Sequence, residues 1–190
     1  ITTQSLWALD DPDNAQLAAI TAPEGVNVAI TRNILGNPIS VRRWGIANGV
    51  AADVTRSYVY DGGQRLCKTL EPEVIATVQG YDPAGNVAWR SPGVNLSGNR
   101  CESEGSVPAA KKISYTYDSV NQLKTVTYGD GSPGIVRTYW NDGLLHTIDS
   151  NGAVWSYDYN SLRKPTSEEL TYEGKKYDFG RDYDANGNLT

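Results

Sequence analysis

The chain has 190 residues, with 17 Lys or Arg against 22 Asp or Glu, so its formal net charge is −5. This acidic balance disfavours binding to nucleic acid phosphates, and no apolar run approaches the roughly 18–20 residues of a membrane-spanning helix. The 12 Tyr, 5 Trp and 19 Gly, set against 1 Phe and no Met, are typical of an antiparallel β protein with a thin core. Long helices are disfavoured because no stretch keeps an apolar helical period without Gly or Pro.

Two series of turn signals alternate along the chain. The first places Asp or Asn at Asn33, Asp61, Asp82, Asp118, Asn141, Asn160 and Asp184, in steps that cluster in the low twenties. The second comprises residues 22–25, 71–73, 130–133 and 149–152, each 11 residues before a member of the first series. Segments of roughly seven residues separate the turns, which is the length of one ordinary strand. The pattern predicts an all-β fold, a repetitive antiparallel meander whose hairpins form a curved sheet strip.

The first series has a simple turn chemistry. In Asp-x-x-Gly the carboxylate accepts a hydrogen bond from the backbone two residues on, and Gly takes the positive-φ position. This sequence is typical of a type I turn closed by a Gly bulge. We therefore expect a turn or capping role, in preference to calcium binding or catalysis, for Asp61, Asp82, Gly85, Asp118, Asp149, Gly152, Asp184 and Gly187.

The segments between the turns alternate in polarity, as in 113–117 and 126–128, which indicates half-buried strands. Tyrosines recur beside the turns. Because residues on one face of neighbouring strands lie close together, they are expected to form an aromatic ladder of Tyr60, Tyr81, Tyr117, Tyr139, Tyr157 and Tyr183. Each repeat is too small to fold alone, so its neighbours supply the missing core.

The repeat weakens in two segments, and longer irregular loops are expected near residues 44–55 and 87–111. We predict that 1–190 forms a single β-sheet region. Because the chain starts at Ile1 in the middle of the pattern, we expect it to be a fragment of a larger protein.

The only cysteines, Cys67 and Cys101, lie 34 positions apart. A structural disulfide that fixes the irregular loop to the sheet is the favoured interpretation, with two free thiols as the alternative. A metal or redox pair is disfavoured, because a metal site needs more ligands and the spacing is not Cys-x-x-Cys. A disulfide would indicate an oxidising compartment.

The remaining candidates for chemistry are few. Trp44 and Trp89 lie near the expected loops and are possible ligand-stacking residues, whereas Trp140 is expected inside a strand and buried. The lone histidine, His146, is expected to be a surface or half-buried strand residue. The sequence has no nucleophile motif, phosphate loop or metal-ligand cluster, so we expect no enzyme, no catalytic residue, no cofactor and no metal site.

The combination Tyr-x-Tyr-Asp-x-x-Gly-x-Leu, repeated from about Ile20 to Thr190, resembles the RHS or YD-repeat family. The resemblance implies a β-sheet strip that coils into a hollow shell. In bacterial polymorphic toxins and insecticidal toxin complexes this shell encloses a C-terminal toxic domain, and in teneurins a related barrel belongs to an adhesion ectodomain. The Asp-Pro-x-Gly junction of toxin-type RHS proteins is not found here, since residues 82–85 form a turn within a repeat.

The resemblance implies a structural module of an exported bacterial RHS protein, which builds a shell or scaffold that encapsulates or displays a toxin domain. Its partners would be neighbouring repeats of the parent chain, other copies of itself or that toxin domain, with no nucleic acid and no membrane span. The expected location is secreted or at the cell surface. Two alternatives stay open: an adhesion or carbohydrate-binding module, and a filament subunit that self-assembles through open sheet edges.

Overall fold

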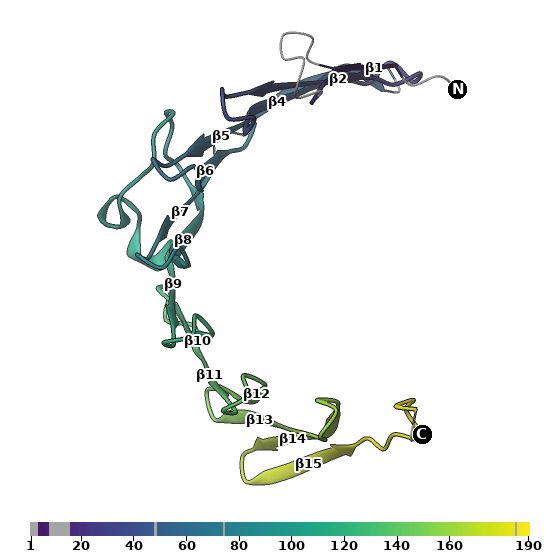
Figure 1. The fold of residues 1–190 in the computed structure, drawn as a ribbon. Coiled ribbons are helices and arrows are strands. Elements are labelled where there is room, and N and C mark those ends of the chain that lie inside the picture. The colour runs from purple at the N-terminus through teal and green to yellow at the C-terminus, as the bar shows by residue number, and fades with distance from the viewer. Residues whose placement is uncertain (1–3, 8–15, 48, 74, 185) are drawn as a thin grey trace. The chain divides into compact units, whose positions relative to one another are not determined.

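A computed structural model describes residues 4–7, 16–47, 49–73, 75–184 and 186–190. The fold is all-β, and its strands pair antiparallel in the order of the chain, from β1 (Gln4–Trp7) to β15 (Lys175–Gly180) (Figure 1). The helical turns of the described residues are η1 (Glu104–Ser106) and η2 (Ala109–Lys111). The predicted antiparallel meander is therefore confirmed.

The chain divides into two compact units, Ile1–Gly80 with Ser91–Val107, and Tyr81–Arg90 with Pro108–Thr190. The strands that follow β1 in the first unit are β2 (Leu17–Thr21), β3 (Asn27–Arg32), β4 (Pro38–Ala47), β5 (Val50–Tyr60), β6 (Leu66–Leu70) and β7 (Ala76–Tyr81), whose last residue belongs to the second unit. Residues of β8 (Val87–Val94) belong to both units. The second unit continues with β9 (Ile113–Tyr117), β10 (Leu123–Tyr128), β11 (Ile135–Tyr139), β12 (Leu145–Ser150), β13 (Ala153–Tyr159), β14 (Pro165–Tyr172) and β15.

The prediction of an irregular loop at residues 44–55 is wrong. This segment belongs to the β4–β5 hairpin, whose ladder runs from Ser40↔Ser57 to Ala47↔Val50. The sequence Asn48-Gly49 is a strong short-range hairpin signal, but no Tyr-Asp pair accompanies it. The loop expected at 87–111 is shorter than predicted, because residues 87–94 form β8 and the irregular part begins after Val94.

The molecule has little interior. Its accessible surface is 12432 Å², whereas a compact monomer of 20.7 kDa is expected to expose about 8,900 Å². The buried apolar side chains of the described residues are Cys67, Ala76, Val78, Val94 and Val107 in the first unit, and Trp89 and Val126 in the second. Most strand residues are half-buried or exposed, so the sheet is a single layer with few covering elements.

Candidate functional site

One turn recurs through the chain, and Asp118 shows its geometry. The Asp118 N–H donates to Gln122 O at 2.9 Å, and Asn121 N donates to Asp118 O at 3.1 Å. The Asp118 carboxylate oxygen Oδ1 accepts Val120 N at 2.9 Å and Gln122 N at 2.8 Å. A side-chain oxygen that accepts two backbone N–H groups fixes a type I turn. The side-chain oxygen also accepts the backbone N–H groups two and four residues later at Asn33, Asp61, Asn160 and Asp184. The Asp82 carboxylate accepts Asn86 N at 2.8 Å.

We call these the Asp turns: the turns that begin at Asn33, Asp61, Asp82, Asp118, Trp140, Asn160 and Asp184. The hydrogen bonds favour the charged carboxylates. Bonding to the Arg65 backbone lowers the pKa of Asp61, and bonding to the Asn188 side chain lowers the pKa of Asp184. The carboxylates of the Asp turns are therefore engaged with backbone and polar partners of their own turns.

Asp149 and Gly152 lie in a different turn. Ser150 pairs with Ala153, so the connection has only two residues, Asn151 at φ 53° and Gly152 at φ 81°. This is a type I′ hairpin turn, for which Asn-Gly is the preferred sequence. Asp149 lies on β12 and accepts Gly152 N at 3.1 Å. The expectation that Asp149 shares one turn position with Asp61 and Asp118 is wrong.

A second difference falls at residues 140–144. The residue that opens this turn is Trp140, whose N–H donates to Leu144 O at 2.8 Å, and not the neighbouring Asn141. Trp140 is 41% exposed, so the expectation that it is buried inside a strand is also wrong. Gly143 holds the positive-φ position at 87°.

The positive-φ position alternates between Gly and a larger residue in successive Asp turns. Its occupants are Gly36, Gln64, Gly85, Asn121, Gly143, Arg163 and Gly187. Each larger side chain binds the preceding turn: Gln64 Oε1 accepts Asn37 Nδ2 at 3.1 Å, Asn121 Oδ1 accepts Asn86 Nδ2 at 2.9 Å, and Arg163 lies 3.3 Å from Asp142 Oδ2. Positive φ is uncommon for residues other than Gly and is tolerated best by Asn, so at Gln64 and Arg163 the bonds between turns offset a local strain. No motif in the sequence indicates this arrangement.

The tyrosines are joined by their hydroxyl groups. Four tyrosines that directly precede an Asp turn donate to a carbonyl at the start of a neighbouring strand: Tyr60 to Pro38 at 2.9 Å, Tyr117 to Val87 at 3.0 Å, Tyr139 to Leu123 at 2.7 Å and Tyr183 to Pro165 at 2.9 Å. Burial raises the pKa of Tyr60 and Tyr117, which keeps these hydroxyls protonated.

Tyr81 and Tyr157 are the other two members of the expected aromatic ladder. Tyr81 ends β7 directly before Asp82, which is the corresponding place in the repeat. Tyr157 departs from the pattern, because the residue before the turn at Asn160 is Tyr159. Tyr157 lies two residues earlier on β13, and its carbonyl accepts Trp140 Nε1 at 3.1 Å.

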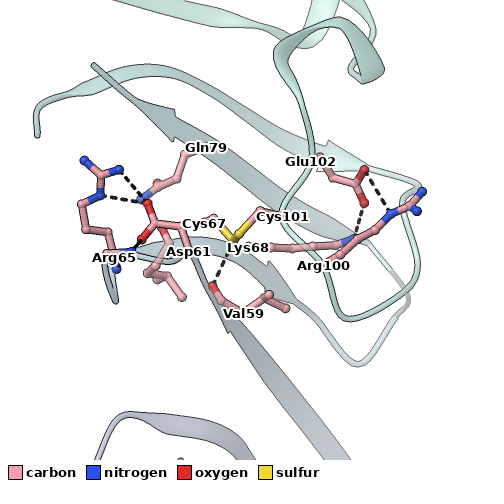
Figure 2. Close-up of a disulfide and its surroundings, with 11 residues drawn as sticks. Val59, Asp61, Arg65, Cys67, Lys68, Gln79, Arg100, Cys101 and Glu102 are labelled. Atoms are coloured by element: carbon pink, nitrogen blue, oxygen red, sulfur yellow. Dashed lines mark hydrogen bonds and ion pairs between the residues drawn. A yellow bond between two sulfur atoms is a disulfide. The ribbon is translucent and has the colours of Figure 1, made fainter. Parts of the chain in front are cut away.

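Cys67 and Cys101 form a disulfide with their Cα atoms 5.4 Å apart, as predicted. Figure 2 shows that it joins β6 to the irregular segment after β8. The next residues of both segments form an ion pair: Lys68 Nζ lies 2.9 Å from Glu102 Oε1, and their side chains are 0% and 7% exposed. The segment is thus attached to the sheet at two adjacent positions, one covalent and one ionic.

The tryptophans named as ligand-stacking candidates differ in exposure. Trp89 is only 7% exposed because it lies in β8, where it pairs with Ser114 of β9, so its assignment as an exposed stacking residue is wrong. Trp44 is half-buried on β4, and the Arg42 guanidinium lies 4.9 Å from the centre of its ring. A cation therefore already covers part of the Trp44 ring.

No group of three or more His, Cys, Asp or Glu side chains in the described ranges is arranged to hold a metal ion. Within the same residues, no helix is both long enough and apolar enough to cross a membrane.

No protein-family model and no curated protein matches the sequence. The fold, in contrast, has clear relatives among solved structures. It matches a chain in the crystal structure of TcdB2-TccC3-Cdc42 with a TM-score of 0.74 and 14% identity, over 99% of this chain and 10% of that chain. A structure of the Photorhabdus luminescens Tc holotoxin pore with a mutated TccC3 gives the same values, and the crystal structure of TcdB2-TccC3-TEV gives a TM-score of 0.75 and 13% identity.

The pattern of Asp turns and strands that pair in chain order defines a repetitive antiparallel β-meander. The structural likeness identifies this meander as an RHS-like fold. The chain spans about a tenth of the length of the solved chains that it matches.

Proposed function

We propose that the chain is a structural module of a larger toxin-associated protein, in which it forms part of a β-sheet wall that encloses or displays another domain. The observation that carries this proposal is the single-layer sheet, which exposes 12432 Å² where about 8,900 Å² is expected. The bonds between successive Asp turns support a rigid wall. The carboxylates are engaged in these turns, which supports a non-catalytic role.

One face of the first unit is suited to be covered by a partner. In the register of β2 to β5, Ile20 lies beside Val28, Val28 beside Arg43, and Arg43 beside Val54. These residues line a hollow of about 350 Å³. Arg43 interrupts this row, and its apolar members Ile20, Val28 and Val54 lose unfavourable contact with water when a domain packs on them.

The disulfide and the fold support a proposal for the compartment. A Cys67–Cys101 disulfide is compatible with an oxidising compartment. Solved structures that share this fold include an assembly of TcdB2 with TccC3 and a Tc holotoxin pore. We therefore propose a bacterial protein that is exported or displayed at the cell surface, with the neighbouring repeats and a toxin domain as its partners.

Hydroxyl-radical footprinting tests this function on the full-length protein, on a version without the enclosed domain, and on the 190-residue chain alone. Val54 and Ile20 should react in the isolated chain and be protected in the full-length protein. Deletion of the enclosed domain should restore their reactivity, while Val126, which is buried in this chain, stays protected throughout as the internal control. Equal reactivity of Val54 in all three samples would contradict the proposal.

A second candidate, end-to-end assembly of copies, is favoured by the exposed edge. All six residues of β15 are exposed, including Tyr177 and Phe179, and open strand edges pair readily with other chains. Sedimentation of the isolated chain, followed by electron microscopy of any large species, separates the two functions. Regular fibres would favour the filament, and a monomer would exclude it.

A further inference from the structure

Trp140 opens an Asp turn without the side-chain acceptor that its counterparts supply. Every other Asp turn begins with Asp or Asn, whose side-chain oxygen accepts backbone N–H groups. An indole has no such acceptor, and Leu144 N donates to Asp142 Oδ1 at 3.1 Å instead. A position that breaks the local rule of a repeat without a gain in turn stability is a candidate for function.

The indole is held in place on one side and open on the other. Its Nε1–H donates to Tyr157 O at 3.1 Å, and its ring centre lies 3.8 Å from that of His146. Despite these two contacts, Trp140 remains 41% exposed to solvent. Trp140 is therefore a fixed aromatic surface, which loses little conformational freedom when a ligand packs on it.

A second departure from the repeat occurs beside it. Tyr60, Tyr117, Tyr139 and Tyr183 each precede an Asp turn and donate their hydroxyl to a carbonyl at the start of a neighbouring strand. Tyr159 precedes the turn at Asn160, yet no protein group in the described part of the chain accepts its hydroxyl. Burial raises the pKa of Tyr159, so the hydroxyl remains a donor.

Both departures line the same hollow, which has a volume of about 450 Å³. This lies within the roughly 300–1,000 Å³ of ligand pockets. Asn141 and Asp158 also line it, and neither side chain has a hydrogen-bond partner among the described residues. The hollow thus combines an open aromatic ring with an amide, a carboxylate and a phenol that all retain hydrogen-bonding capacity.

We propose that this hollow binds a saccharide, with the C–H face of one sugar ring on Trp140. Tyr159 and Asn141 would donate to ring hydroxyls, and Asp158 would accept from them. A neutral polyol fits better than an anion because Asp158 is unpaired, while Asp142 is balanced by Arg163 at 3.3 Å. The site lies in the second unit and includes neither of the tryptophans that the sequence singled out, and it does not depend on the proposed wall function.

The decisive variant is Trp140→Asp, which restores the turn residue of the repeat and removes the aromatic surface. It loses the bond to Tyr157 O and the contact with His146, but unlike an alanine variant it supplies the missing acceptor, which offsets part of that loss and should keep the turn folded. The variant Tyr159→Phe removes only the hydroxyl. Leu162→Ser is the matched control, since Leu162 is 65% exposed in the adjacent Asp turn and does not line the hollow.

The experiment screens the native 190-residue chain on an array of immobilised neutral oligosaccharides, and titrates the strongest one into the native chain and each variant by isothermal titration calorimetry, which does not depend on the tryptophan that the decisive variant removes. Trp140→Asp should weaken binding about tenfold or more, as expected for loss of an aromatic contact. Tyr159→Phe should weaken it roughly fivefold, the effect of one hydrogen bond. Leu162→Ser should leave it unchanged.

Three outcomes would overturn the proposal. In the first, the native chain binds no saccharide on the array. In the second, Trp140→Asp binds the saccharide as tightly as the native chain. In the third, a quaternary ammonium ion displaces the bound oligosaccharide but free sugar does not. The last result would assign the hollow to a cation. Circular dichroism and thermal unfolding of each variant ensure that a loss of binding is not a loss of folding.

Discussion

Reduction of the Cys67–Cys101 disulfide should destabilise the first unit alone. The bridge spans a sequence separation of 34 residues, and closure of such a loop lowers the entropy of the unfolded chain by an amount worth about 3.8 kcal/mol at 25 °C. The irregular segment that carries Cys101 otherwise depends on the ion pair of Glu102 with Lys68 and on the packing of Val107. We therefore expect the free energy of unfolding to fall by about 3–4 kcal/mol.

The assay is urea unfolding of the oxidised chain, the reduced chain and the double variant Cys67→Ala/Cys101→Ala, combined with amide hydrogen exchange. The reduced chain and the double variant should lose stability together, with faster exchange in β6 and β7. Strands β9–β15 belong to the other unit and serve as the internal control, because their exchange should not change. A loss below about 1 kcal/mol, or equal acceleration in both units, would refute the argument.

Three further predictions concern single side chains. Glu102→Gln should lower the free energy of unfolding, measured in urea, by about 3–5 kcal/mol, because it leaves the ammonium of Lys68 buried without a counter-ion. A double variant that also replaces Lys68 by Met should recover most of this loss. No recovery would contradict the view that the two charges stabilise the fold as a buried pair. Gly129→Ala should lower the free energy of unfolding by about 1–3 kcal/mol, since its Cβ would collide with the Ala109 carbonyl. An unchanged melting temperature would contradict this, because it would mean that the backbone at Ala109 moves aside without loss of stability. The hydrogen bond from the Asn188 side chain lowers the folded-state pKa of Asp184. The contribution of Asp184 to stability is therefore present above its unfolded pKa and is lost as the pH falls through its folded pKa. Asp184→Asn should reduce this loss of stability at acid pH, and an identical dependence of stability on pH in the variant would contradict the capping role.

The features that sequence reasoning could predict are those with local causes. Asp118 and Asp184 form turns through hydrogen bonds to residues within four positions, so the motif alone contains the necessary groups. The meander follows from these turns and from the strand-length segments between them. The disulfide could be favoured because Cys67 and Cys101 are the only cysteines.

The features that it could not predict depend on residues far apart in sequence. Gln64, Asn121 and Arg163 occupy a position that normally requires Gly, and their partners lie in the preceding Asp turn. No local motif identifies those partners. The sequence also could not show that Trp140 opens its turn in place of Asn141. Asn141 is a typical first residue of an Asp turn, and it lies only one position after the true first residue.

The burial of Trp89 has the same kind of cause. The sequence around it lacks the repeat, which predicted a loop, yet β8 is a regular strand because β9 pairs with it at Trp89↔Ser114. Strand propensity depends on such partners more than on the segment itself. The position of a tryptophan near an irregular sequence was therefore a poor guide to its exposure.

The central claim is that this chain forms a wall whose exposed edge and face are covered in the whole protein. Electron cryo-microscopy of the full-length protein tests it most directly. The account predicts that the free edge of β15 (Lys175–Gly180) pairs with a further hairpin, and that density from another domain covers the row of Ile20, Val28 and Val54. A β15 edge and an apolar row that both remain open to solvent in the full-length protein would contradict it.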